Sequence, residues 1–218
     1  MEDRVTPFLY LELVDQPAGE YGTTRVPEVL GRGGVTRGSW WSDCVPGRRD
    51  LPRRLDDLPT LGLYECTPEF APPPAPAGGG LGLHLRQVRP GQGTLSAGPT
   101  LGLELVLISP RHPERARPLR DWGDFVHIHD IAAAAPAGFS MITPYENLTG
   151  GEPRYLHLYE LDTDDPEPAF QAMTPTTRAR LDAGGWNAHP FDEWAWHEEL
   201  VIEFVSTFRR EGTADPTV

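Results

Sequence analysis

The chain has 218 residues and a formal net charge of −13 at pH 7. A nucleic-acid groove or an anionic membrane surface requires clustered cations, so we expect this acidic chain to bind neither partner. All 19 basic residues are arginine, which excludes a lysine Schiff base, a pyridoxal-phosphate anchor and a P-loop lysine.

We expect no targeting segment in this sequence. Its start, Met1 to Arg4, is polar, and no apolar run approaches the roughly 20 residues that a membrane span requires. We therefore expect a cytoplasmic protein in which Cys44 and Cys66 stay reduced, although both end predicted strands and a bridge is geometrically conceivable. The length allows one large domain or two domains of about 100 residues.

Apolar, β-prone runs alternate with one helical pattern in the first part of the chain. Tyr21, Val26, Val29 and Leu30 are spaced to share a helix face, with Pro27 kinking or restarting that helix. The expected elements are strands at 8–14, 35–44 and 61–66, a helix at 15–32 and a long Arg- and Pro-rich connection at 46–59.

The segment 68–80 takes the place of a second helix. It contains Pro72-Pro73-Pro74 and Gly78-Gly79-Gly80, which cannot form a continuous helix. A glycine-rich phosphate loop would open a helix, whereas here a strand at 81–88 follows. We therefore expect an ordered loop or a flexible spacer.

The second part of the chain repeats the order of the first and adds the missing helix. Trp122, Phe125, Val126, Ile128 and Ile131 form the expected buried stripe of its first helix. The expected elements are strands at 101–108, 138–147, 155–162 and 200–208, helices at 114–135 and 167–181, a Trp-rich segment at 184–199 and a frayed tail from 211.

An internal repeat supports a duplicated architecture. The segment 61–65 returns as 156–160 with one position changed, and 9–14 returns as 101–106. Each copy has the strand and helix order of a ferredoxin-like unit. We predict an α+β fold in which two tandem ferredoxin-like repeats, at 1–95 and 96–210, pack sheet to sheet as a pseudo-symmetric dimeric α+β barrel. A flexible tail at 211–218 follows.

Two pairs of glutamates lie at matched positions of the repeat. Glu12 matches Glu104, and Glu65 matches Glu160, each within an otherwise apolar strand. If both members of a pair approach the interface between the sheets, they can act as acid and base. The plainer interpretation is that they alternate outward, toward the helices or a rim.

Several motifs in the second copy carry a family resemblance. They are Trp122, Val126-His127-Ile128-His129-Asp130-Ile131, Pro136-Ala137-Gly138-Phe139, Tyr145 and Arg154-Tyr155-Leu156-His157-Leu158-Tyr159-Glu160-Leu161. This set resembles the EthD-like branch of the dimeric α+β barrel superfamily, with His129 at the place where a proline is common. The first copy matches more weakly, with Arg25 at the place of His127. The superfamily includes cofactor-independent monooxygenases, isomerases, polyketide cyclases and haem enzymes, so the resemblance implies fold more than activity.

His127 is the first candidate for chemistry. It precedes Asp130 by three residues, which places both on one side of a helix, where the carboxylate can orient the imidazole. A histidine titrating near neutrality can take a proton from an acidic carbon or a phenol. In this hypothesis Tyr145 donates a hydrogen bond to the developing enolate or phenolate. The alternative is an ordinary helix histidine bonded to a carbonyl or to solvent.

Six further residues are candidates for substrate binding. His157 lies in a strand and faces the helix layer or fills it, while Trp40 and Trp41 must point to opposite faces of theirs. Arg25 either binds an anionic group or pairs with Glu28. The full set is Trp40, Trp41, Arg25, Met141, Thr143 and His157.

We expect no metal site and no cofactor. His129 points away from His127 on a helix, so the two do not make a ligand pair. A cluster at His189, Asp192, Glu193 and His197 is at most a weak metal site, and a solvated surface segment is the better interpretation.

The sequence therefore predicts a cofactor-independent enzyme that acts on a small aromatic or polyketide-like molecule. Oxygenation, cyclisation or isomerisation would proceed through a stabilised carbanion. The alternative is a non-catalytic binding or assembly module, and a third possibility is a haem protein. Because one helix is missing, we also predict either an insert that covers the exposed sheet or association into a homodimer.

Overall fold

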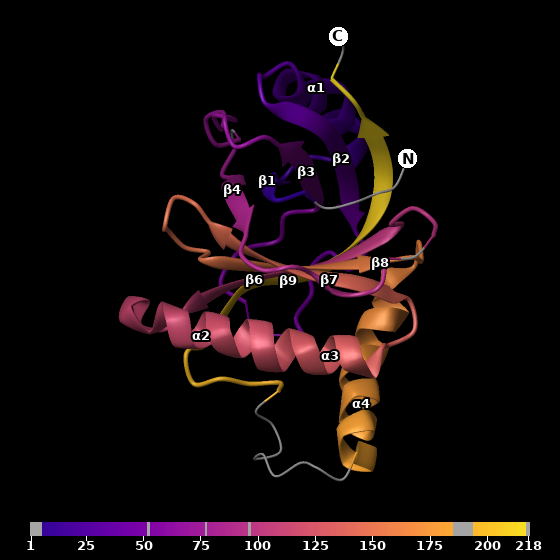
Figure 1. The fold of residues 1–218 in the computed structure, drawn as a ribbon. Coiled ribbons are helices and arrows are strands. Elements are labelled where there is room, and N and C mark those ends of the chain that lie inside the picture. The colour runs from indigo at the N-terminus through magenta and orange to yellow at the C-terminus, as the bar shows by residue number, and fades with distance from the viewer. Residues whose placement is uncertain (1–5, 52, 77, 96, 185–193, 217–218) are drawn as a thin grey trace.

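Eight antiparallel strands form a closed barrel in the computed structural model, which describes residues 6–51, 53–76, 78–95, 97–184 and 194–216 (Figure 1). The strand order around the barrel is β4-β1-β3-β2-β9-β6-β8-β7, and pairing of β4 with β7 closes it. The strands are β1 (Phe8–Val14), β2 (Val35–Asp43), β3 (Thr60–Cys66), β4 (Leu81–Gln87), β6 (Gly102–Pro110), β7 (Phe139–Asn147), β8 (Tyr155–Leu161) and β9 (Leu200–Ala214). A short ninth strand, β5 (Gln92–Gly93), pairs with β7.

The two halves of the chain contribute four strands each in the same order. The first half runs β4-β1-β3-β2 and the second runs β9-β6-β8-β7. β9 pairs with β6 along its first part and with β2 along its last part, so it carries the sheet from one half into the other. The barrel is therefore one continuous hydrogen-bonded structure.

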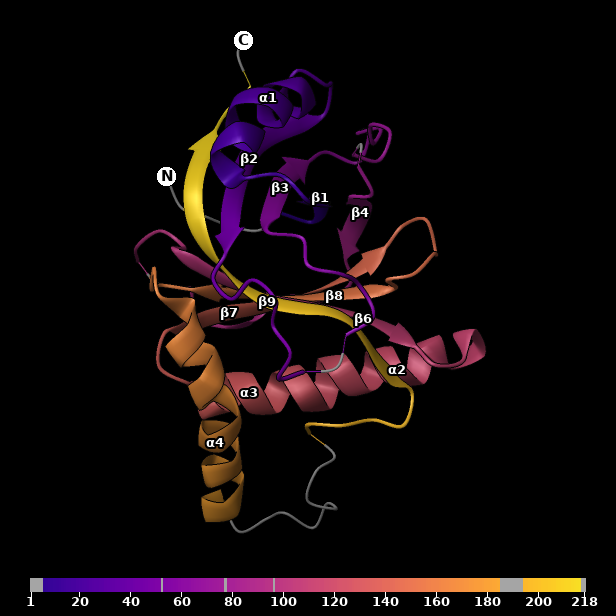
Figure 2. The same cartoon turned by 180° about the vertical axis from the view of Figure 1, so that it is seen from behind.

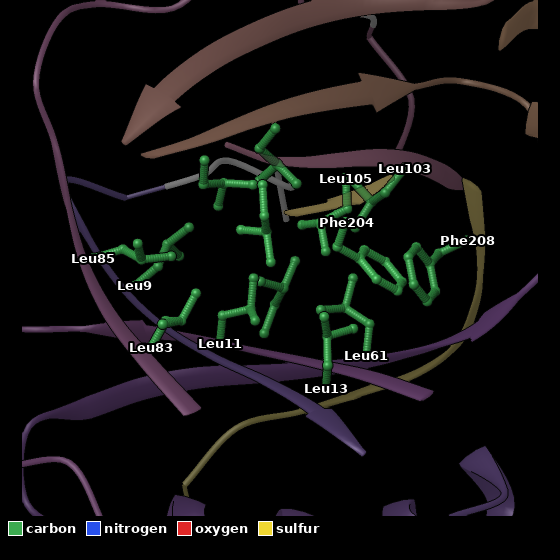
Figure 3. Packing of buried hydrophobic residues seen from close by; sticks show 14 of the residues in the cluster. Leu9, Leu11, Leu13, Leu61, Leu83, Leu85, Leu103, Leu105, Phe204 and Phe208 are labelled. Carbon is green, nitrogen blue, oxygen red and sulfur yellow. The ribbon is translucent and has the colours of Figure 1, made fainter. Parts of the chain in front are cut away.

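Leucines at alternating strand positions fill the barrel (Figure 3). Because successive side chains of a strand point to opposite faces, Leu9, Leu11 and Leu13 all point inward from β1. They meet Leu105 and Phe204 from the second half in the same cluster. The inner faces of the two halves thus share a single apolar core.

Helices cover the outer faces of the barrel on opposite sides (Figures 1 and 2). α1 (Ala18–Leu30) lies over the first half and tolerates Pro27 within it. The long helix over the second half consists of α2 (Ala116–Trp122), a π-helical segment (Gly123–His127) and α3 (Ile128–Ala134). A 3₁₀ turn (Pro113–Arg115) precedes it, and α4 (Pro166–Gly184) lies beside it. None of the helices in the described ranges is long and apolar enough to cross a membrane.

The segment 67–80 covers the part of the first half that lacks a second helix. Its described residues form no helix or strand. Phe70 is buried, and its ring lies 5.5 Å from the ring of Tyr10 on the outer face of β1. The predicted ordered insert is therefore present, while the homodimer stays a prediction.

The strand register corrects one of the sequence matches. Leu9 lies opposite Glu65 in the first half, and Leu103 lies opposite Glu160 in the second. The position that corresponds to Glu104 is consequently Tyr10, so Glu12 and Glu104 are two residues apart in register. A shift of two keeps both side chains on the outer face, because the side-chain period of a strand is two.

Two further expectations were wrong. Phe125 is 57% exposed, because it lies in the π-helical segment, where the α-helical period that placed it in the buried stripe does not hold. The tail does not begin at Glu211, since β9 continues to Ala214 and pairs with β2. Cys44 and Cys66 are free thiols, as expected.

Candidate functional site

A cavity of about 170 Å³ lies between the outer face of the second half of the barrel and its helices. Its wall is mostly apolar and contains four side chains that can exchange or share protons. The lining residues are Leu51, Glu104, Val106, Ile108, Trp122, His127, His157, Tyr159, Phe170, Met173, Thr174, Trp194, Ala195, Leu200, Ile202 and Val205.

Strand alternation and register bring three of these groups together. On β8, His157 and Tyr159 are two residues apart and share the outer face. On β6, Glu104 lies directly opposite Tyr159, and Val106 lies opposite His157. Side chains at opposed positions have Cβ atoms about 5 Å apart. The carboxyl, the phenol and the imidazole therefore occupy one small patch of the sheet.

His127 approaches this patch from the π-helical segment. Its Nδ1 lies 2.7 Å from the carbonyl oxygen of Trp194, and its Nε2 lies 3.0 Å from the hydroxyl oxygen of Tyr159. Burial lowers the pKa of His127, although the Trp194 carbonyl opposes this effect. In the neutral ring, Nδ1–H donates to Trp194, and Nε2 accepts from Tyr159. His127 is thus arranged to draw the proton of the Tyr159 hydroxyl.

Aromatic rings enclose the imidazole. The ring of Trp122 stacks on His127 at 5.1 Å between centroids, and the ring of Trp194 lies 6.5 Å away and nearly parallel. The ring of His157 stacks at 5.8 Å. Such apolar walls restrict the access of water, which strengthens electrostatic interactions inside the cavity.

His157 is a second buried imidazole on the wall of the cavity. It is 3% exposed, and burial together with the nearby His127 lowers its pKa to about 3. A Cβ at Gly123 would lie 2.9 Å from its Cε1 atom. A glycine in the helix therefore gives this ring its space, and the ring remains neutral at physiological pH.

Glu104 is a buried acid. It is 1% exposed, and its Oε2 atom has no partner among the described residues. Burial raises the pKa of Glu104 to about 8, an effect that Arg48 opposes and Glu167 reinforces. Burial and the neighbouring Glu104 also raise the pKa of Tyr159 well above its ordinary value. At neutral pH the cavity consequently presents a protonated carboxyl beside a neutral phenol.

Of the predicted catalytic residues, only His127 lines this cavity. Asp130 does not orient it, because both ring nitrogens of His127 bond to other groups. Tyr145 points into the barrel core, on the opposite face of the sheet, and its hydroxyl donates to the carbonyl of Thr6 at 2.9 Å. These two assignments were wrong.

Of the predicted binding residues, His157 alone lines the cavity. Trp41 lies in the barrel core, whereas Trp40 packs on the outer face of the first half, so the expected opposition is confirmed but neither tryptophan reaches the site. Met141 and Thr143 also lie outside its lining. Both approach Gly91, where an added Cβ would lie 2.6 Å from the Met141 Sδ and 2.7 Å from the Thr143 Oγ1.

The corresponding region of the first half holds a hydrogen-bonded cluster of its own side chains, and a cavity of about 260 Å³ beside this cluster is lined by Tyr21, Arg25 and Glu28. The hydroxyl of Tyr21 donates to Glu12 at 2.9 Å and lies 2.7 Å from the hydroxyl of Tyr64. Arg25 donates to Glu12 at 3.0 Å and pairs with Glu28 at 2.8 Å, so the expected surface pairing is joined by a buried one. The acid of this half is therefore matched by a cation, unlike Glu104.

The other glutamate pair faces the barrel interior. Glu65 and Glu160 line a second cavity of about 40 Å³ together with Leu63 and Leu158. Thr100 donates to Glu160 at 2.8 Å, and burial raises the pKa of Glu160 to about 7. A cavity of this volume holds a few waters at most. It is too small for an organic substrate.

The donor set does not fit a metal or a haem group. No three candidate ligands cluster within the described residues, and His189, Asp192 and Glu193 lie outside them. His129 is exposed and bonds to Gln92 at 3.3 Å. Both nitrogens of His127 are engaged, so this ring offers no free nitrogen to a haem iron. A cavity of about 170 Å³ is also small for a macrocycle.

Sequence reasoning missed Tyr159, Trp194 and the position of Glu104 on the cavity wall. The signal for Tyr159 was its spacing of two from His157 on one strand, which places both on the same face. Trp194 acts through its backbone carbonyl, which every residue type has, so no signal in the sequence points to it.

The comparisons with known proteins support the fold. No family model matches the sequence, and neither does any curated protein. One similar solved structure is a "putative monooxygenase" from Fusobacterium nucleatum subsp. nucleatum ATCC 25586, at 7% identity over 97% of this chain and 95% of that chain, with a TM-score of 0.50. Another is an "anthrone oxidase-like protein", at 10% identity over 97% and 93%, with a TM-score of 0.50. At such identities the likeness shows the fold alone, that of the eight-stranded dimeric α+β barrels.

Proposed function

We propose that the chain is a cofactor-independent enzyme that removes a proton from a small, neutral, single-ring aromatic molecule. The observation that carries this proposal is the arrangement of proton-exchanging groups on one apolar wall. A Tyr159–His127 pair provides a base, and the protonated carboxyl of Glu104 lies on the adjacent strand.

The volume of the cavity favours a single ring. An engineered apolar cavity of about 150 Å³ binds benzene, and the cavity here measures about 170 Å³. Drug-sized ligands occupy pockets of about 300 Å³ or more. We therefore favour the small aromatic class over a multi-ring polyketide. Among the described residues the lining contains no arginine, and its histidines are neutral, so an uncharged substrate suits it best.

The base acts through the phenol. The Tyr159 oxygen accepts the substrate proton while the Tyr159 hydroxyl proton passes to Nε2 of His127. The Trp194 carbonyl, already bonded to Nδ1–H, stabilises the imidazolium that results. General-base catalysis of this kind contributes about 10²- to 10⁴-fold.

The acid stabilises the oxyanion of the product. A carboxyl kept neutral by an apolar site can donate a hydrogen bond to an enolate or phenolate oxygen at neutral pH. Glu104 meets this requirement, since it is buried and protonated. The stabilised carbanion can then react with dioxygen, cyclise or isomerise, and the names of the similar solved structures favour oxygenation.

The fold supports a related proposal about origin. The shared strand order of the two halves, with helices on both outer faces, suits tandem ferredoxin-like repeats at 1–95 and 96–210 of the EthD-like branch. In the first repeat the cavity of about 260 Å³ on the outer face is lined by Tyr21 and Arg25, and Arg25 is already paired with the buried Glu12. We propose that only the second repeat carries a working site.

Proton exchange at carbon tests the proposed function. Phenylacetone is an uncharged single-ring carbon acid, and exchange of its α-protons in D₂O can be followed by proton NMR. We expect the protein to accelerate this exchange, and Tyr159→Phe and His127→Ala to slow it by about 100-fold or more. Tyr155→Phe is the matched control, because Tyr155 lies on the same strand but bonds to the Ala116 carbonyl outside the cavity. Equal exchange by wild type and Tyr159→Phe would refute the mechanism.

A further inference from the structure

The loop between β2 and β3 belongs to the first half but reaches the cavity of the second. Figure 2 shows it descending along β9 toward α3. Leu51 of this loop lines the cavity, and Arg48 is buried at 2% exposure. A buried arginine is rare unless it is paired.

Arg48 is held by three groups. Its Nη1 lies 2.9 Å from Asp50, and its Nη2 pairs with Glu167 at the start of α4. Its guanidinium lies 4.6 Å from the ring centroid of Phe170, which lines the cavity. The positive charge is therefore fixed directly behind the cavity wall.

Glu167 connects this charge to the strand that neighbours the acid. Thr207 on β9 donates to the Oε2 of Glu167 at 2.7 Å, and Thr207 lies opposite Glu104 in the sheet. The other ionisable groups facing Glu104 are Tyr159 on β8 and the two neutral histidines of the cavity. Within the described residues, Arg48 and Glu167 are the formal charges that act on Glu104.

We propose that Arg48 is a positioning residue that, together with Glu167, acts electrostatically on the Glu104 carboxyl. The charge pair does not touch the substrate. Glu167 is held beside the strand of the acid, because Thr207, which donates to Glu167, lies opposite Glu104 in the sheet, and the Arg48 guanidinium lies over the Phe170 ring that lines the same cavity. The loop of the first half thereby completes the site of the second. This inference rests on the proposed function, in which Glu104 is the acid.

The two charges act in opposite directions, which makes the proposal testable. Removing the positive charge with Arg48→Met should keep Glu104 protonated to higher pH. Removing the negative charge with Glu167→Gln should let Glu104 ionise at lower pH, because Arg48 then acts without its counter-charge. A nearby charge shifts the pKa of a carboxyl by roughly one unit.

Infrared spectroscopy can measure this without substrate. The C=O stretch of a protonated carboxyl is followed against pH, and Glu104→Gln assigns the band by removing it. We expect the midpoint to rise by roughly one unit in Arg48→Met, to fall in Glu167→Gln and to stay in Arg48→Lys. Arg54→Met, an exposed arginine of the same loop, is the matched control and should leave the midpoint unchanged.

An unchanged midpoint in both Arg48→Met and Glu167→Gln would overturn the proposal. If Arg48→Met fails to fold, Glu167→Gln alone decides, since it must still lower the midpoint. The readout also separates this inference from the proposed function. If the Glu104 midpoints shift but the protein does not accelerate proton exchange in phenylacetone, the proposed function is refuted and the role of Arg48 stands. If the protein accelerates exchange but the midpoints do not shift, the proposed function stands and the role of Arg48 is refuted.

Discussion

Replacing Glu104 by glutamine should stabilise the protein in a pH-dependent manner. The carboxyl has an ordinary pKa of 4.5 and a pKa of about 8 in the folded protein. Below pH 4.5 both the folded and the unfolded states are protonated. Between pH 4.5 and about 8 only the folded state keeps the proton, so stability falls as the pH rises through this window. Glutamine does not titrate and removes this dependence.

The magnitude follows from the size of the shift. At about 1.36 kcal/mol per unit, the shift corresponds to up to about 5 kcal/mol between the two ends of the window. Urea unfolding of both proteins at a series of pH values measures it, and Glu114→Gln, at an exposed site, is the control. If the free energies of unfolding of wild type and Glu104→Gln differ by the same amount at every pH between 4.5 and about 8, Glu104 is not protonated in the folded protein.

Three further predictions concern the packing around both halves. Gly123→Ala should destabilise the protein by about 1–3 kcal/mol, because its Cβ would lie 2.9 Å from His157; adding His157→Ala should restore most of this in urea unfolding. Arg25→Met should cost about 3 kcal/mol, since it leaves the buried Glu12 unpaired, whereas the more exposed Arg32→Met should cost little. The ring of His157 should remain neutral at about pH 5, where an ordinary histidine is protonated; imidazole NMR signals of a protonated ring would contradict its burial.

Apolar patterning was sufficient to predict most of the elements. The strand expected at 8–14 is present as β1, and the one expected at 61–66 as β3. These strands are apolar on both faces, because one face fills the barrel and the other lies under a helix or a loop. A continuous apolar run indicates that a strand is present, but it does not indicate to which face of the sheet each side chain points.

The errors in the site come from that missing direction. Tyr145 and Tyr159 are both tyrosines of second-half strands, but Tyr145 points into the barrel and Tyr159 toward the helices. A shift of one residue exchanges the two faces. Asp130 was chosen from helical spacing alone, whereas His127 takes its partners from β8 and from the Trp194 backbone.

Contacts between segments far apart in the chain could not be predicted from the sequence. Arg48 and Glu167 come from a loop of one half and a helix of the other, and no local pattern links them. Glu104 appeared to match Glu12, yet the register moves them apart by two residues. One is consequently paired with Arg25, and the other remains an acid beside a cavity.

A crystal structure of the protein soaked with phenol tests the central claim most directly. We expect the phenol ring to lie in the cavity between Trp122 and Tyr159, with the phenol oxygen within about 3 Å of Glu104 or Tyr159. A cavity closed by its own side chains, or a phenol bound only elsewhere on the barrel, would contradict it.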